Sequence, residues 1–211
     1  MVAGGLYHPV KLNQPTISFP GLQGGNNWGG MAFDPTSGLL FVNTSDLGQV
    51  TVLVPSNGPL PYERGPVSGR FQQTETRMPC QKPPWGQLHA VDSRTGLVRW
   101  QATLGVTDSL PAALADTGRP NVGGPIVTAG GLVFIGATDD SRFRAFDART
   151  GKQLWSHTLE ASAHATPMSY RGADGRQYVV VMATGGSFLD SPVTADTLVA
   201  FALPARRPPD I

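Results

Sequence analysis

The sequence has little of what would assign it to several common classes of protein. Its one cysteine, Cys80, has no second cysteine with which to form an internal disulfide. Charged residues make up only 15% of the 211 residues, the net charge is +1, and no cluster of lysine and arginine supports a nucleic-acid partner. No apolar run approaches the ~18 residues of a membrane-spanning helix, and residues 1–5 do not resemble the start of a signal peptide. The sequence alone therefore indicates no compartment.

Segments of helical periodicity are missing as well. The chain contains 26 glycines and 19 prolines, which divide it into short pieces. This composition favours many short strands joined by turns over helices. The fold class that we expect is all-β.

A repeated segment organises the chain. Residues 89–100 and 144–155 have Ala, Asp, Arg, Thr, Gly and Trp at the same offsets, and a truncated third copy occupies residues 199–202. The alanines of the three copies, Ala90, Ala145 and Ala200, are each 55 residues apart. A fixed period of this length is typical of a repeat architecture.

Each of the two complete copies predicts a strand, a tight turn and a docked tryptophan. In the turn Asp-x-x-Thr-Gly, the aspartate accepts backbone N–H groups and the glycine supplies a positive φ. The strand that follows ends in Trp100 in one copy and Trp155 in the next. A large ring at this position fills the space between neighbouring sheets, so we expect both tryptophans to be docked.

Four antiparallel strands joined by short turns form one propeller blade. We expect a lead-in loop at 1–25, a blade at 26–104 with an insertion at 55–84, a second blade at 121–160, and an incomplete last blade at 161–204. The insertion is rich in proline and has no clear periodicity.

The predicted architecture is therefore a partial β-propeller of about three four-stranded blades. The first blade is expected to open with a strand at 28–33, and a further strand is expected at 49–54. Propellers need ~4–8 blades to close. We therefore expect the C-terminal part of a longer protein, the alternative being a small sheet that closes by self-association.

The repeat Ala-x-Asp-x-x-Thr-Gly-x-x-x-Trp resembles the blade motif of dehydrogenases that use pyrroloquinoline quinone (PQQ). From about residue 19 to 204, the chain is similar to the C-terminal portion of the membrane-bound PQQ glucose dehydrogenase group. Further segments carry this resemblance: residues 28–35, 79–86, 123–131, 165–170 and 177–181. The resemblance implies an eight-bladed propeller with tryptophan-docking motifs.

The same resemblance implies a function. Members of the group oxidise the CH–OH groups of sugars or polyols such as glucose or quinate. They use PQQ with a Ca²⁺ or Mg²⁺ ion and pass electrons to ubiquinone at the periplasmic face of the bacterial inner membrane. The general base and the metal ligands belong to earlier blades, so we expect no catalytic residue and no metal ligand in this chain. The missing blades of the same propeller are expected partners, and the isolated chain is expected to be inactive.

The resemblance also implies cofactor-binding residues. Asn43 aligns with an asparagine that contacts PQQ, and an amide both donates and accepts hydrogen bonds, which suits an ortho-quinone. Asn27 and Trp28 align with residues near the cofactor, and Gly185 and Gly186 match a glycine-rich loop beside it. Each has a plainer interpretation: a strand end for Asn43, packing between blades for Trp28, and an ordinary turn for the glycines.

Three further positions bear on the chemistry. Gly186 or Ser187 stands where glucose-oxidising members have a histidine, which leaves quinate or another polyol open as the substrate. Asp139 and Asp140 could bind metal or share a proton, but a solvated turn is the favoured interpretation. His164 is the one histidine near a family loop, and no role follows for it from the sequence.

Two other functions compete with the dehydrogenase. The same blade repeat also builds non-catalytic propeller scaffolds that bind proteins in outer-membrane assembly, and a degenerate fragment without function is the third alternative. Asn43, Trp28 and the glycine-rich loop favour the dehydrogenase, because a scaffold does not need polar and glycine-rich elements at the propeller axis.

Overall fold

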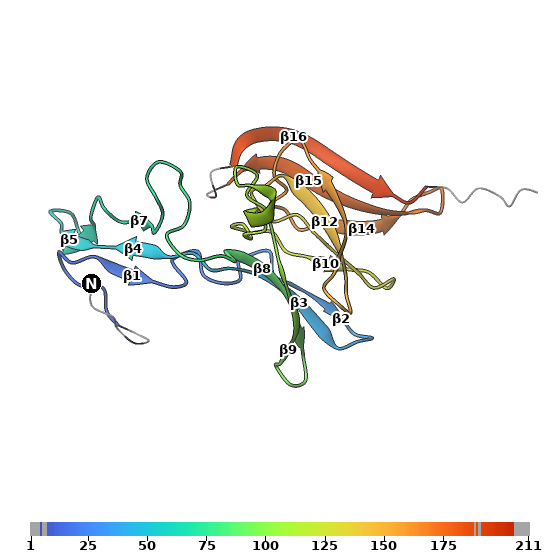
Figure 1. The fold of residues 1–211 in the computed structure, drawn as a ribbon, viewed down its shortest axis with the longest axis horizontal. Coiled ribbons are helices and arrows are strands. Elements are labelled where there is room, and N and C mark those ends of the chain that lie inside the picture. The colour runs from blue at the N-terminus through green and yellow to red at the C-terminus, as the bar shows by residue number, and fades with distance from the viewer. Residues whose placement is uncertain (1–4, 6–7, 188, 190, 205–211) are drawn as a thin grey trace, which may run out of the picture.

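In the computed structural model, residues 5, 8–187, 189 and 191–204 are described. Three antiparallel sheets follow one another along the chain and stack as blades (Figure 1). The first blade contains β2 (Met31–Asp34), β3 (Leu39–Ser45), β8 (Gly86–Asp92) and β9 (Val98–Thr103). The second contains β10 (Ile126–Val127), β11 (Leu132–Ile135), β12 (Arg142–Asp147) and β13 (Gln153–Thr158). The third contains β14 (Met168–Arg171), β15 (Gln177–Gly186) and β16 (Ser191–Ala202).

The prediction of an all-β, partial propeller is confirmed. The first two blades have four strands and the third has three. Ala90, Ala145 and Ala200 lie on β8, β12 and β16, the third strand of each blade, so the sequence repeat is also the structural repeat. Among the described residues, the one helical element is a short 3₁₀ turn, η1 (Ala112–Leu114), and no helix is long and apolar enough to cross a membrane.

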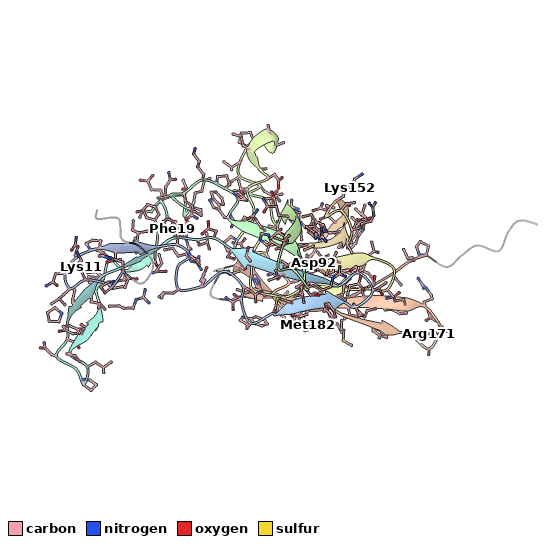
Figure 2. The ribbon with its side chains drawn as sticks, turned by 90° about the horizontal axis from the view of Figure 1, so that it is seen from below. Lys11, Phe19, Asp92, Lys152, Arg171 and Met182 are labelled. Atoms are coloured by element: carbon pink, nitrogen blue, oxygen red, sulfur yellow. The ribbon has the colours of Figure 1, made fainter. Side chains whose placement is uncertain are left out.

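An arm extends from the blades, and the sequence did not indicate it (Figure 1). It contains β1 (Thr16–Ser18), β4 (Gln49–Thr51) and β7 (Gly69–Arg70) in one sheet, beside the hairpin of β5 (Leu53–Pro55) and β6 (Tyr62–Arg64). Figure 2 shows Lys11 and Phe19 on this arm, at the opposite end of the molecule from Arg171.

The arm corrects three expectations. The lead-in of residues 1–25 is not all loop, because β1 pairs with β4. The insertion of residues 55–84 contains β6 and β7 rather than being irregular throughout. The expected strand at 49–54 is two strands in different sheets. Strands of two or three residues are too short to show a period of two, and their partners are distant in sequence.

Two apolar clusters hold the blades together. Between the first and second blades, Phe41 and Leu88 pack with Val133, Ile135 and Phe146. Between the second and third blades, Phe143 packs with a second set of buried residues: Leu159, Ala163, Val179, Val181 and Ala183. The central strand β12 is covered on both faces and is buried from residue 143 to residue 146. The second blade is therefore the core of the described structure.

The Asp-x-x-Thr-Gly turns have the predicted chemistry. Asp92 Oδ1 accepts hydrogen bonds from the backbone N–H groups of Arg94 and Thr95, at 3.0 and 3.3 Å. Asp147 Oδ1 accepts the equivalent two bonds in the next blade, at 3.0 and 2.8 Å. The glycines of the two turns have φ of 73° and 72°, a conformation that strains any residue with a Cβ.

The two tryptophans differ. Trp100 Nε1 donates to the Ala148 carbonyl at 2.9 Å, and a Cβ built on Gly151 would lie 2.5 Å from the Trp100 ring. Trp100 of the first blade is therefore docked on the turn of the second. Trp155 packs edge-on against Phe143 of its own blade and Phe201 of the third blade but remains 37% exposed, so it is docked only in part. In the third copy of the repeat, Ala202 stands where the first two copies have the aspartate of the turn.

We expect acid to remove stability from the first of these turns. The hydrogen bond from Arg99, followed by the bond from the Arg94 N–H, lowers the pKa of Asp92 to about 2 from its ordinary 3.8. Because the folded pKa is the lower one, the stabilisation is complete above pH ~4 and is lost as the pH falls toward 2. Urea unfolding midpoints between pH 7 and pH 2 should fall less steeply for Asp92→Asn than for the wild type. Parallel acid profiles would contradict this.

Candidate functional site

The site lies where the first strands of the three blades begin. Strands β2 and β10 are neighbours there, and glycines allow their backbones to touch. A Cβ built on Gly29 would lie 2.1 Å from the Gly124 nitrogen, and one built on Gly123 would lie 2.6 Å from the His164 carbonyl oxygen. Only glycine fits these two positions, so the segments before β2, β10 and β14 are locked together at one end of the propeller.

Asn43 lies at the centre of this junction and is 1% exposed. Its Nδ2 donates to Asn121 Oδ1 at 2.6 Å and to the Gly123 carbonyl at 2.8 Å. Its Oδ1 is buried and has no hydrogen-bond partner among the described residues. A buried acceptor without a partner costs ~1–3 kcal/mol, so the junction lacks one donor.

Backbone carbonyls determine which side-chain atom of Asn43 has no hydrogen-bond partner. The Nδ2 group of Asn121 donates to the carbonyls of Thr44 and Arg119, at 2.9 and 3.1 Å. Carbonyl oxygens only accept, so Asn121 must turn its own oxygen toward Asn43. Asn43 then uses both N–H groups on Asn121 and Gly123, and the unpaired atom is an acceptor. Sequence reasoning missed Asn121, whose only signal was its place just before the Gly123-Gly124 pair.

Asn27 and Trp28 lie in the loop that runs beside the end of β3. The Ser45 N–H donates to the Gly25 carbonyl at 2.8 Å, and Asn26 Nδ2 donates to the Asn43 carbonyl at 3.2 Å. The expected strand at 28–33 begins only at Met31, so Trp28 belongs to a turn. Trp28 is 65% exposed, which contradicts ordinary packing between the described blades. The side chain of Asn27 makes its hydrogen bonds within the loop: its Oδ1 accepts from the Trp28 N–H and its Nδ2 donates to the Gln23 carbonyl.

Gly185 and Gly186 form a turn with positive φ, 62° and 66°. The Gly185 N–H donates to the Ser162 carbonyl at 2.9 Å, and a Cβ on Gly185 would lie 1.7 Å from the Val193 carbonyl oxygen. Gly186 has open space around its Cα apart from a methyl group of Thr194. His164 connects this turn to the Asn43 junction. Its ring is hydrogen-bonded to Ser191, the cross-strand partner of Gly186, and its backbone carbonyl contacts Gly123.

A cavity of about 290 Å³ lies next to the junction. Arg119, whose carbonyl accepts from Asn121, forms part of its wall, and Leu189 of the third blade forms another part. Apolar and polar side chains both line it, among them Trp85, Met78, Thr107, Ser109 and Asp139. Its size is at the low end of the range for small-molecule sites, and residues of the insertion and of the loop before β10 form much of its lining.

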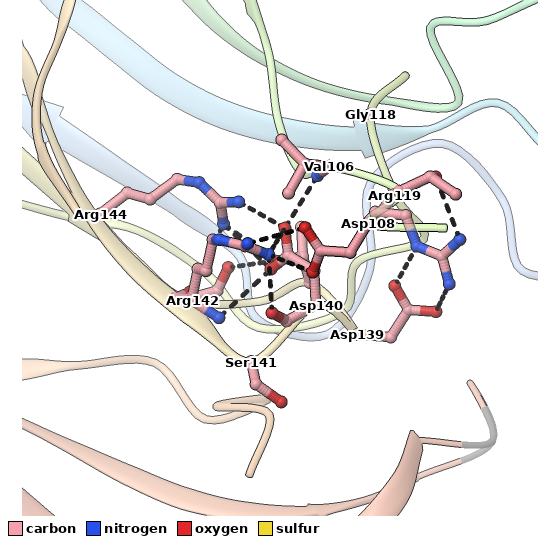
Figure 3. Close-up of polar contacts among 12 residues, drawn as sticks. Val106, Asp108, Gly118, Arg119, Asp139, Asp140, Ser141, Arg142 and Arg144 are labelled. Carbon is pink, nitrogen blue, oxygen red and sulfur yellow. Dashed lines mark hydrogen bonds and ion pairs between the residues drawn. The ribbon is translucent and has the colours of Figure 1, made fainter. Parts of the chain in front are cut away.

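Asp139 and Asp140 are not a solvated turn, and that prediction is wrong. Arg119 binds Asp139 with two hydrogen bonds, from Nε at 2.7 Å and Nη2 at 2.6 Å (Figure 3). Asp140 is buried and pairs with the equally buried Arg144. Asp140 also accepts from the Val106 N–H at 2.8 Å. Arginines therefore already occupy both carboxylates.

The charge of Asp140 is stabilised by its partners. Burial opposes ionisation, but the hydrogen bond and the attraction from Arg144 outweigh it, so the pKa of Asp140 lies below its ordinary value. Around this pair, Arg142 binds the exposed Asp108 at 2.8 Å, which joins the loop before β10 to the second blade (Figure 3). Among the described residues, no three His, Cys, Asp or Glu side chains gather as a metal site.

Comparison with known proteins agrees with the fold. A family profile described as the PQQ type of glucose/ethanol/alcohol dehydrogenase, β-propeller domain, matches residues 1–179. Glycerol dehydrogenase large subunit of Gluconobacter thailandicus is 38% identical over 95% of this chain and 31% of its own length. Quinate/shikimate dehydrogenase (quinone) of Acinetobacter baylyi is 39% identical over 89% of this chain and 26% of its own. Quinoprotein glucose dehydrogenase A of Acinetobacter calcoaceticus is 37% identical over 96% and 28%.

Solved structures show the same relationship. A europium-containing methanol dehydrogenase superposes with a TM-score of 0.64 at 27% identity, over 84% of this chain and 28% of that one. The chain thus spans about a quarter to a third of the length of the relatives it matches. The chain belongs to the β-propeller family of PQQ-dependent glucose, ethanol and alcohol dehydrogenases.

Proposed function

We propose that this chain forms one side of the PQQ site of a dehydrogenase that oxidises a sugar or polyol. The observation that carries the proposal is the unpaired, buried Asn43 Oδ1 at the junction of the blades. The exposed ring of Trp28 belongs to the loop whose Asn26 side chain donates to the Asn43 backbone carbonyl. When bound, PQQ supplies the two-electron oxidising chemistry. The relatives oxidise, by their names, glycerol, quinate or shikimate, and glucose, which supports a substrate of this class.

The residues fit a planar, anionic cofactor with one change to the expected contacts. The exposed Trp28 ring offers a face for stacking, and the Gly185-Gly186 turn offers backbone groups that a ligand can approach closely. Both N–H groups of Asn43 are already used in hydrogen bonds to Asn121 and Gly123, so Asn43 does not donate to a quinone oxygen. Its free oxygen instead accepts from an N–H or O–H group of the ligand. Because this oxygen is enclosed by protein, part of its surroundings must move before a ligand can donate to it.

The remaining parts of the enzyme belong, in this proposal, to further blades of the same propeller. Large apolar side chains are exposed on both outer blades, Met31 and Phe33 on the first and Met168, Tyr170 and Leu198 on the third. They resemble the faces buried between the described blades, and further blades would cover them. We assign to those blades the general base and the ligands of Ca²⁺ or Mg²⁺. Ubiquinone as acceptor and the periplasmic face of the inner membrane follow from the same family relationship.

The substrate would approach through the cavity of about 290 Å³ beside the junction. Its mixed lining suits a polyhydroxylated molecule, whose C–H faces pack on apolar groups while its hydroxyls bind polar ones. The substitution of Gly186 or Ser187 at the expected histidine leaves quinate or another polyol as candidates beside glucose.

Titration of the purified chain with PQQ and Ca²⁺ tests the cofactor assignment. We expect quenching of tryptophan fluorescence, most of it from Trp28, and no dye reduction with glucose or quinate. Asn43→Ala should weaken binding about tenfold, as loss of one buried hydrogen bond predicts, whereas the exposed Asn57→Ala should not. Unfolding midpoints of both variants separate a lost contact from a lost fold. Equal affinities for the two variants would sink the role of Asn43, and an absence of binding would favour a scaffold.

A further inference from the structure

His164 is a buried histidine between the second and third blades, and the proposed function gives it no task. It is 5% exposed, within a segment, 161–164, that is buried throughout. Its ring approaches two partners, the Ala137 carbonyl from Nδ1 at 3.1 Å and Ser191 Oγ from Nε2 at 2.8 Å. Both ring nitrogens are therefore occupied, by groups from two different blades.

The Ala137 carbonyl determines the tautomer. A carbonyl oxygen only accepts, so Nδ1 carries the hydrogen and Nε2 of the neutral ring accepts from the Ser191 hydroxyl. Ala137 is itself held firmly: its N–H donates to the Ala163 carbonyl at 2.7 Å, and it has a φ of 63°. Burial lowers the pKa of His164, although the Ala137 bond and the charge of Asp139 act in the opposite direction.

Ser191 connects His164 to the glycine turn. Ser191 begins β16 and is the cross-strand partner of Gly186 at the end of β15. Two hydrogen bonds thus tie the two sides of this hairpin end to the 161–164 segment: Gly185 N–H to the Ser162 carbonyl, and Ser191 Oγ to His164. The backbone of His164 also packs on Gly123, which accepts from Asn43.

We propose that His164 is a positioning residue, which holds the Gly185-Gly186 turn at a fixed place relative to the Asn43 junction. The inference rests on the proposed function, because it gives that turn its task beside the cofactor. The 161–164 backbone alone provides one tether, at Gly185. The His164–Ser191 bond provides the second, and two tethers are needed to fix the orientation of a turn as well as its distance.

Amide hydrogen exchange of peptides that cover residues 183–194 tests the tether directly. We expect exchange about fivefold to tenfold faster in His164→Phe and in Ser191→Ala, which corresponds to the loss of one hydrogen bond. Ser191→Thr keeps the hydroxyl and should restore slow exchange. His157→Phe is the matched control, because His157 lies exposed on β13. If His164→Phe fails to fold, the exchange rates of Ser191→Ala alone decide whether the tether exists.

PQQ affinity, measured by tryptophan quenching on the same variants, tests the purpose of the tether. We expect about tenfold weaker binding in His164→Phe and Ser191→Ala, and wild-type binding in Ser191→Thr and His157→Phe. Unchanged exchange in both tether variants would overturn the proposal whatever PQQ does. Faster exchange with unchanged affinity would overturn the positioning role. If the wild type binds no PQQ, the proposed function and the positioning role fail together, while the exchange data still show whether the tether exists.

Discussion

Trp100→Ala should destabilise the chain by ~3–5 kcal/mol, the range found when a packed aromatic residue is truncated to alanine. The ring lies against Gly151 of the next blade and 5.8 Å, centroid to centroid, from Phe41 in the first cluster. Its N–H bond to Ala148 spans the two blades, so truncation also leaves that carbonyl without its donor. The urea midpoint of unfolding measures this loss of contacts between the first and second blades. The residues that form the two Asp-x-x-Thr-Gly turns are unchanged in the variant.

Two other tryptophans provide matched controls for Trp100. Trp28→Ala should change the midpoint little, since that ring is 65% exposed. Trp155→Ala should have an intermediate effect, because Trp155 packs on Phe143, Phe201 and His157 but is still 37% exposed. If all three substitutions have equal effects, Trp100 does not dock between blades as described.

Asp140→Ala should be about as damaging, with a loss of ~3–5 kcal/mol. Asp140 and Arg144 have side chains that are each 2% exposed, and removal of one partner leaves an uncompensated charge in the core of the second blade. The same substitution removes the acceptor of the Val106 N–H, which fastens the loop before β10. Thermal or urea unfolding measures the loss at neutral pH.

A paired substitution distinguishes an uncompensated charge from a merely missing contact. Asp140→Val combined with Arg144→Met removes both charges and should recover most of the stability, as exchanges of buried ion pairs for apolar side chains often do. Asp108→Ala serves as the control, because Asp108 is 69% exposed and its pair with Arg142 should contribute no more than ~1 kcal/mol. A double variant as unstable as Asp140→Ala would show that the hydrogen bonds of Asp140, rather than its charge balance, matter most.

Acid should act on Asp140 in the same direction as on Asp92. The pKa of Asp140 is lower in the folded chain than in the unfolded one, so its contribution is present above the ordinary carboxyl pKa and declines below it. In the Asp140→Val, Arg144→Met variant this part of the acid sensitivity should disappear. The Asp92 part should remain, because Asp92 lies at the far end of the first blade's hairpin.

Local chemistry explains why the blade repeat could be predicted from the sequence. The turn that contains Asp92 and Gly96 is specified by residues within a few positions of one another, and its hydrogen bonds close within that span. The strands on either side alternate over enough residues to show a period of two. Because the same pattern recurs 55 residues later, both the blade and the family could be predicted from the sequence.

Contacts between distant segments decided the rest. The carboxylates of Asp139 and Asp140 are adjacent to a turn signal, but Arg119 and Arg144 determine that they are paired rather than solvated. The state of Trp155 depends on whether a following blade supplies a turn to cover it. The arm forms only because β1 meets β4, and strands that short carry no signal of their own.

The candidate site illustrates the same division. The family resemblance placed Asn43, Trp28 and the two glycines near a cofactor, but their hydrogen-bonding roles depend on residues far away in sequence. Asn121 turns Asn43 so that its oxygen is left unpaired, and His164 connects the glycine turn to that junction. The sequence by itself determined the blades, because their turns and alternation are local. Only the tertiary structure decided which polar atoms are satisfied, because burial and partners arise from packing between blades.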